Sequence, residues 1–124
     1  MDVPTRQFAD IVVAAPSGRI DHAAAGGLEQ ALAPLLAEAG SRKAGLILDF
    51  SNVEYISSVG LRVLMIAAKQ MRGNGARIVV AEPRPIVAEI FAISRFDRVF
   101  DIVPSVRGAL GQLSAAALAA YDAG

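Results

Sequence analysis

The feature that most constrains the fold is the alternation, from residue 11 onward, of short apolar runs with segments of helical periodicity. Leu46–Phe50 is an almost unbroken apolar run of strand length, which is typical of a strand covered on both faces. A helix is predicted from about Ser58 to Arg72, followed by a second buried strand from Arg77 to Ala81. Two strands joined through a helix need a crossover connection, so they are predicted to lie parallel in one sheet.

The other predicted elements fit the same architecture. They are a hairpin of Val3–Phe8 and Ile11–Ala15, a break at Pro16–Gly18, a helix from Ala23 to about Gly40 that Pro34 should kink, a helix opened by Pro83 and Pro85, a short strand over Val99–Val103, and an alanine-rich helix over about 105–121. We therefore expect an α/β fold with a mixed, mostly parallel sheet of four to five strands and about four helices. Residues 1–124 should form a single domain, with its core over about residues 3–105.

Composition excludes several classes of function. The absence of cysteine rules out disulfides and thiolate metal sites. Twelve basic residues balance twelve acidic ones, which gives no electrostatic footprint for nucleic acid or an anionic membrane. The first residues, Met1–Arg6, do not resemble a signal peptide, and no apolar run is long enough to span a bilayer. We expect a cytoplasmic protein without membrane insertion.

Catalytic signatures are missing. His22 is the only histidine, so a multi-histidine metal site is excluded. A triad of Ser58, His22 and Asp49 lacks the glycine expected two residues before the nucleophile. There is no phosphate-binding loop, and Asp49 lacks the acidic pair that would hold magnesium in a receiver domain. We expect neither an enzyme nor a bound cofactor or metal.

The most informative segment runs from the buried strand at residues 46–50, through what is predicted to be a short loop, to the predicted helix beginning near residue 58. Ser57 or Ser58 is the expected N-cap of this helix, because a serine hydroxyl there accepts a hydrogen bond from a free first-turn amide. A helix cap would account for this serine pair without any further function.

The same segment resembles the STAS family, the anti-sigma-factor antagonists. The matching motifs are Asp49-Phe50-Ser51, Tyr55-Ile56, Ser57-Ser58-Val59-Gly60-Leu61, Gly18-Arg19-Ile20-Asp21, Arg77–Val80 and Ile90–Phe96. The resemblance as a whole spans roughly residues 3–105, which makes it far more specific than one short motif. Two positions differ from the family pattern: Ser57 replaces a frequent aspartate, and Arg19 replaces a common glutamate.

The resemblance implies a binding module that does no catalysis of its own. It would bind an anti-sigma factor that is also a serine kinase, be phosphorylated by it at Ser58 (or, as the alternative, Ser57), and be restored by a serine phosphatase. The implied partner-binding residues are Asp21, Ser57, Val59, Arg62, Val63 and Ile66. A second reading from the same family is a STAS subunit of a lipid transporter or a sensory assembly.

The predicted helix carries apolar residues on two faces. Leu61, Leu64, Met65 and Ala68 share the face that we assign to the core. Val59, Val63 and Ile66 lie on nearly the opposite side, where a surface helix is normally polar. Either the following helix covers these three residues, or they are scattered exposed residues that need no explanation, or they form a docking stripe beside Ser58.

Overall fold

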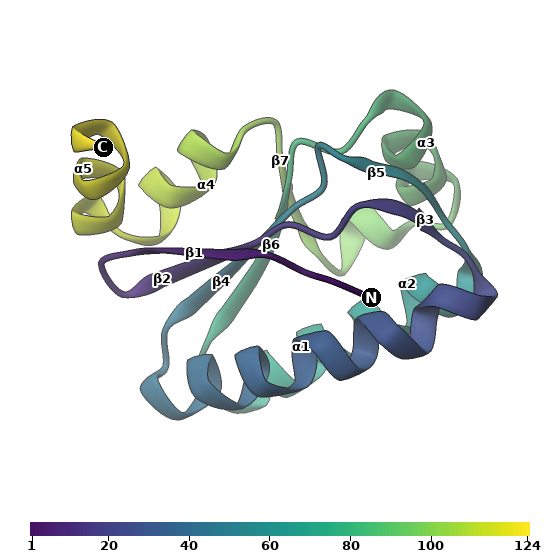
Figure 1. Cartoon of the computed structure of the whole chain (residues 1–124), viewed down its shortest axis with the longest axis horizontal. Coiled ribbons are helices and arrows are strands. Elements are labelled where there is room, and N and C mark those ends of the chain that lie inside the picture. Colours follow the sequence, from purple (N-terminus) through teal and green to yellow (C-terminus); the bar gives the residue numbers. More distant parts are fainter.

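The computed structural model describes all residues, 1–124 (Figure 1). Its strands are β1 (Thr5–Phe8), β2 (Ile11–Ala14), β3 (Gly18–Ile20), β4 (Gly45–Asp49), β5 (Val53–Ile56), β6 (Arg77–Ala81) and β7 (Asp101–Val103). Its helices are α1 (His22–Arg42), α2 (Ser58–Gly73), α3 (Pro85–Ile93), α4 (Val106–Leu113) and α5 (Ala115–Ala123), with a 3₁₀ turn η1 (Phe96–Arg98). No helix combines the length and the apolar character needed to cross a membrane.

Five strands form the main sheet, in the order β1-β2-β4-β6-β7. The β1–β2 hairpin is antiparallel, and every other neighbouring pair is parallel. In the centre of the sheet, Ile47 of β4 lies beside Val79 of β6. The mixed, mostly parallel sheet predicted from the alternation of strands and helices is confirmed.

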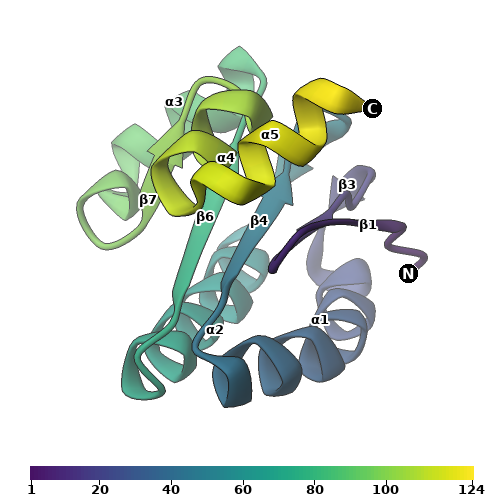
Figure 2. The same ribbon diagram turned by 90° about the vertical axis from the view of Figure 1, so that its left-hand side faces the viewer.

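Helices cover both faces of this sheet, as Figures 1 and 2 show: α1 and α2 lie on one side, and α4 and α5 on the other. Successive side chains of a strand point to opposite faces. Leu46 and Leu48 of β4 therefore join the larger core beneath α1 and α2, whereas Ile47 joins a smaller core beneath α4. All three are fully buried, each stabilising the fold by about 1.5–3 kcal/mol. The continuous apolar run of this strand follows from having two covered faces.

A second, two-stranded sheet pairs β3 with β5 in parallel. The sequence analysis expected a loop where β5 lies, and this expectation is wrong. Phe50, just before β5, packs against Phe91 of α3, which stacks in turn on Phe96 at a ring-centroid distance of 4.9 Å. The small sheet is thus joined to the domain by an aromatic core.

The C-terminal region corrects another expectation, because the single helix predicted over about 105–121 is two helices. Ser114 has extended backbone angles (φ −162°, ψ 119°), and its hydroxyl accepts a hydrogen bond from the Ala117 amide. The same hydroxyl donates to Asp10 in the β1–β2 turn at 2.9 Å. A cap and a tertiary contact therefore end α4 and begin α5. The chain has five α-helices, one more than predicted.

The first helix is longer than predicted. It continues through Pro34 and past Gly40 as far as Arg42, and ends at Lys43, whose φ of 53° lies in the left-handed region. The Lys43 amide donates to the Ala39 and Gly40 carbonyls, so the chain closes the helix with backbone hydrogen bonds.

Candidate functional site

The site is built where two helices begin side by side. Strands β3 and β5 are parallel, and their last residues, Ile20 and Ile56, are partners in the register. The next residues, Asp21 and Ser57, are the N-caps of α1 and α2. The Ser57 amide donates to the Ile20 carbonyl at 2.8 Å, which fixes one helix start against the other. The structure therefore brings together Asp21 and the serine pair, which are far apart in the sequence.

The two adjacent serines occupy different positions in α2. Ser57 is the N-cap, with extended backbone angles, and its Oγ accepts a hydrogen bond from the Gly60 amide at 3.2 Å. Ser58 is the first helical residue, its side chain is exposed, and its hydroxyl makes no hydrogen bond within the chain. Of the two candidate N-caps, the structure selects Ser57 and leaves the Ser58 hydroxyl free.

Gly60 is needed because α2 begins very close to the small sheet. A Cβ atom at this position would lie 2.8 Å from Ile20 Cγ2, 2.8 Å from Ile56 Cγ1 and 3.3 Å from the Ile20 carbonyl oxygen. Contacts at 2.8 Å are shorter than real Cβ atoms accept, and the atoms concerned belong to fully buried side chains. The glycine of the serine motif thus serves packing, a role that the sequence analysis did not assign.

The surroundings of Ser58 favour an anion. The first turn of α2 contains no acidic residue, and with the Gly60 amide bound to Ser57, the Ser58 and Val59 amides remain without an intrahelical acceptor. The positive end of the α2 dipole also attracts a negative charge to this position. Arg62 follows Ser58 by one helical turn, is exposed, and takes part in no ion pair.

Arg19 and Asp21 border the helix starts. The Arg19 guanidinium lies 4.5 Å from the centroid of the Tyr55 ring, so cation–π stacking between β3 and β5 holds it in place. Asp21 Oδ1 accepts a hydrogen bond from the Ala24 amide at 3.0 Å, and the side chain is half-buried. Asp21 is thus held at the edge of the site as a helix cap.

The apolar stripe on α2 faces a groove between α1 and α2. The groove has a volume of about 190 Å³ and is lined by Ala25, Gly26 and Glu29 of α1 and by Val59, Arg62, Val63 and Ile66 of α2. The neighbour of the stripe is therefore α1, and the suggestion that the following helix covers it is wrong. The α1 residues that line the groove could not be predicted from the sequence, because only the tertiary structure shows that α1 packs beside α2.

Exposure differs strongly along this stripe. Val63 is half-buried and packs against the larger core, whereas the Ile66 side chain is 50% exposed. Leu61, Leu64 and Ala68 are buried as predicted, but Met65, assigned to the core, is 41% exposed. Ile66 is therefore the stripe residue with the most surface available to a partner.

The residues considered for a catalytic triad do not form one. His22 is exposed at the first position of α1, and the Asp49 carboxylate accepts a hydrogen bond from the Ser51 amide at 3.0 Å. No hydrogen bond joins either residue to Ser58. No three histidine, cysteine, aspartate or glutamate side chains gather closely enough to hold a metal ion.

Comparison with known proteins finds several relatives that are named as anti-sigma factor antagonists. BtrV of Bordetella bronchiseptica, a protein named as an anti-sigma factor antagonist, is 39% identical over 77 residues, which cover 62% of this chain and 66% of BtrV, just under two thirds. An anti-sigma factor antagonist from Mycobacterium paratuberculosis superposes with a TM-score of 0.79 at 25% identity, covering 90% of this chain and 92% of that one. One from Thermotoga maritima gives a TM-score of 0.81 at 20% identity, covering 90% and 93%.

The fold also occurs in a protein solved in a phosphorylated form and in part of an anion transporter. It matches the phosphorylated form of the Bacillus protein SpoIIAA with a TM-score of 0.63 at 15% identity, covering 90% of this chain and 98% of SpoIIAA. It matches part of the murine anion transporter Slc26a9 with a TM-score of 0.73 at 18% identity, covering 85% of this chain and 18% of the transporter. A family model described as the STAS domain matches residues 2–109, most of the chain, and the protein therefore belongs to the STAS domain family.

Proposed function

We propose that this protein is an anti-sigma factor antagonist whose binding is switched by phosphorylation of Ser58. In its unmodified form it binds an anti-sigma factor that is also a serine kinase. The kinase phosphorylates Ser58 and the complex dissociates, and a serine phosphatase later restores the binding form. The protein itself acts as a phosphate acceptor and binding module and catalyses no step.

The observation that carries this proposal is the division of roles between two neighbouring hydroxyl groups. Ser57 Oγ is occupied by the Gly60 amide, so modifying it would remove the cap of α2. Ser58 Oγ is exposed and unbonded, so a kinase can reach it without opening the fold. BtrV, named as an anti-sigma factor antagonist, supports the antagonist role, and SpoIIAA, a protein of this fold with a phosphorylated form, supports regulation by phosphorylation.

In the phosphoryl transfer, ATP and the base come from the partner kinase, and the only reacting group of this chain is the Ser58 hydroxyl. The serine oxygen forms a bond to the γ-phosphorus of ATP, the bond from that phosphorus to the β,γ-bridging oxygen breaks, and ADP leaves. The serine proton passes to a base on the kinase. The domain contributes an exposed acceptor oxygen at a fixed position on α2.

The phosphate should disturb the complex more than the domain. It adds a charge of about −1.5 to −2 and several strong acceptor oxygens. Within the domain it meets the free Ser58 and Val59 amides, the positive end of the α2 dipole, and the Arg62 guanidinium one turn away. A partner docked over this surface would have to bury the dianion, which costs several kcal/mol unless a new cation compensates.

The groove between α1 and α2 supplies the rest of the docking surface. Ile66 exposes half of its side chain beside Val59 and Arg62, on the α2 face that starts at Ser58. An apolar contact of this kind next to an exposed arginine is typical of residues that anchor protein interfaces. The kinase would thus contact Asp21, Ser57 and Ser58 at the helix starts and the stripe along α2.

Phosphorylation of purified protein by the kinase that co-purifies with it, with ATP, tests the switch. Mass spectrometry should find one phosphate, on Ser58. Ser58→Ala should bind the kinase but remain unmodified, and Ser57→Ala, the matched control, should still be phosphorylated. Phosphate on Ser57, or a binding kinase that leaves the wild type unmodified, would refute the proposal.

Two lysine substitutions test the docking surface. Ile66→Lys should weaken kinase binding by roughly 2 kcal/mol, since an ammonium group replaces an apolar contact, while stability changes by less than about 0.5 kcal/mol. Val63→Lys should lower both binding and the melting temperature, because Val63 packs against the core. Unchanged binding by a folded Ile66→Lys variant would show that the partner does not use this groove.

A further inference from the structure

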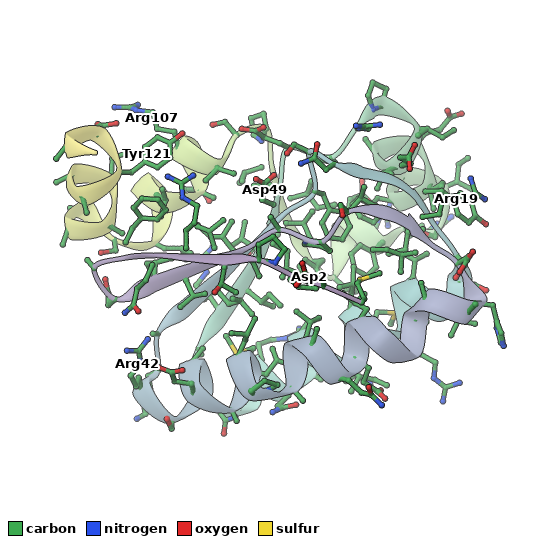
Figure 3. The ribbon with its side chains drawn as sticks, in the orientation of Figure 1. Asp2, Arg19, Arg42, Asp49, Arg107 and Tyr121 are labelled. Atoms are coloured by element: carbon green, nitrogen blue, oxygen red, sulfur yellow. The ribbon has the colours of Figure 1, made fainter.

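A second cavity lies on the face of the main sheet that α4 and α5 cover, opposite to α1 and α2, at the carboxyl ends of the parallel strands. It has a volume of about 350 Å³ and lies between Asp49 at the end of β4, Glu82 just after β6, Arg6 of β1 and Tyr121 of α5. Asp49 and Tyr121 both lie on the side of the sheet that carries α4 and α5, away from α1 (Figure 3). Carboxyl ends of strands are the usual ligand position in α/β sheets, and this volume suits a small molecule.

One wall of the cavity presents two tethered carboxylates. Asp49 Oδ1 accepts from the Ser51 amide at 3.0 Å, and Glu82 Oε1 accepts from the Val106 amide at 3.1 Å. Both side chains are half-buried, neither forms an ion pair, and each has a second oxygen without a partner in the chain. Glu82 also has a φ of 55°, in the left-handed region that non-glycine residues rarely adopt. The backbone is thus strained at the residue that supplies one of the carboxylates.

The facing wall presents a cation and a phenol. The Arg6 guanidinium lies 4.8 Å from the centroid of the Phe8 ring, which packs edge-on against Tyr121 at 5.3 Å. Arg6 forms no ion pair, although two carboxylates line the same cavity, and the Tyr121 hydroxyl makes no hydrogen bond within the chain. Stacking on Phe8 holds the cation away from the acids.

A ligand with one positive and one negative group could pair with the carboxylates on one wall and with Arg6 on the other at the same time. We infer that this cavity binds a small zwitterion of the amino-carboxylate type. Its ammonium group would lie between Asp49 and Glu82, and its carboxylate would meet the Arg6 guanidinium, which binds carboxylates through two parallel hydrogen bonds. Val13 and Val106 supply apolar wall for the carbon chain between the two charges.

Part of this site lies outside the region shared with the family. The STAS match ends at residue 109, whereas Tyr121 belongs to α5. The Arg107–Asp122 ion pair at 2.9 Å holds α5 against α4, and the Ser114 hydroxyl at the start of α5 bonds to Asp10 in the hairpin. The aromatic wall is therefore a feature of the C-terminal segment of this chain.

Calorimetric titration of the full chain with an ω-amino acid series tests the inference. Glycine, 4-aminobutyrate and 6-aminohexanoate vary the distance between the charges, with n-butylamine and butyrate as half-molecule controls. At least one zwitterion should bind with one-to-one stoichiometry, and each half-molecule should bind about two- to fivefold more weakly, as expected for partly exposed charge pairs.

Variants localise the binding. Arg6→Gln and Asp49→Asn should each weaken binding of the best zwitterion about two- to fivefold. Asparagine keeps an acceptor for the Ser51 amide, and a melting curve verifies the fold of both. Ser58→Ala and Arg72→Gln, both on α2 and outside the cavity, should bind as the wild type does. The inference is overturned if no zwitterion binds at millimolar concentration, if a half-molecule binds equally well, or if both cavity variants retain full affinity.

Discussion

The separate roles of the two serines can be tested by stability alone, without any partner. Replacing Ser57 by alanine removes the acceptor of the Gly60 amide at the start of α2. Losing an N-cap serine costs about 1 kcal/mol. Unfolding entropy of about 2.1 cal/mol/K per residue gives roughly 0.26 kcal/mol/K for a chain of 124 residues, so this loss should lower the melting temperature by about 4 °C.

The matched variants make this prediction specific. Ser58→Ala removes an exposed hydroxyl without a partner, so its free energy of unfolding should stay within about 0.5 kcal/mol of the wild type. Ser57→Asp should recover most of the stability lost in Ser57→Ala, because aspartate caps helices as well as serine does. Differential scanning calorimetry and urea unfolding of the four proteins measure the effects. A loss at Ser58 equal to or greater than that at Ser57 would refute the assignment of the cap.

Two further predictions concern packing and charge. Gly60→Ala should lower the free energy of unfolding in urea by about 1–3 kcal/mol, because its methyl group meets buried side chains at 2.8 Å; Gly73→Ala, where a Cβ meets nothing within 4 Å, should be neutral or stabilising. The hydrogen bond and charge of Arg107 lower the pKa of Asp122, so this pair stabilises the fold above the usual aspartate pKa of about 4 and loses that effect as pH falls through the lowered value. On acidification at low salt, the melting temperature of Asp122→Asn should therefore fall slightly less than that of the wild type. A steeper fall for the variant would contradict this stabilising role of the pair.

The general architecture could be predicted because it depends on local patterns. The apolar run that became β4, the periodicity of α2 and the glycines after it give strand, helix and helix end from sequence neighbours alone. The antiparallel hairpin of β1 and β2 then follows from its short turn, and the parallel direction of the other strands follows from the helices that connect them. The predicted helix over residues 58–72 agrees with the observed Ser58–Gly73 to within one residue.

The parts that could not be predicted depend on distant contacts. Strand β5 has only four residues, with Val53 and Ile56 buried, Tyr55 half-buried and Glu54 exposed, so it shows no regular alternation. It is a strand because β3, more than thirty residues earlier, pairs with it. The break at Ser114 likewise depends on its hydrogen bond to Asp10, 104 residues away in the sequence. The alanine-rich sequence around Ser114 carries no local sign of this contact.

The assignment of the phosphate acceptor depends on both the local sequence and a distant contact. The sequence offers two adjacent hydroxyl groups, and either could cap a helix. The choice depends on the residue at which α2 begins, and this is fixed where Gly60 lies against Ile20 and Ile56, with the Ser57 amide bonded to the Ile20 carbonyl. With Gly60 in the third position, its amide reaches Ser57, and Ser58 must point to solvent. The packing that stabilises the helix start therefore also exposes the acceptor, so a phosphate there can change what the surface binds while the fold beneath it stays the same.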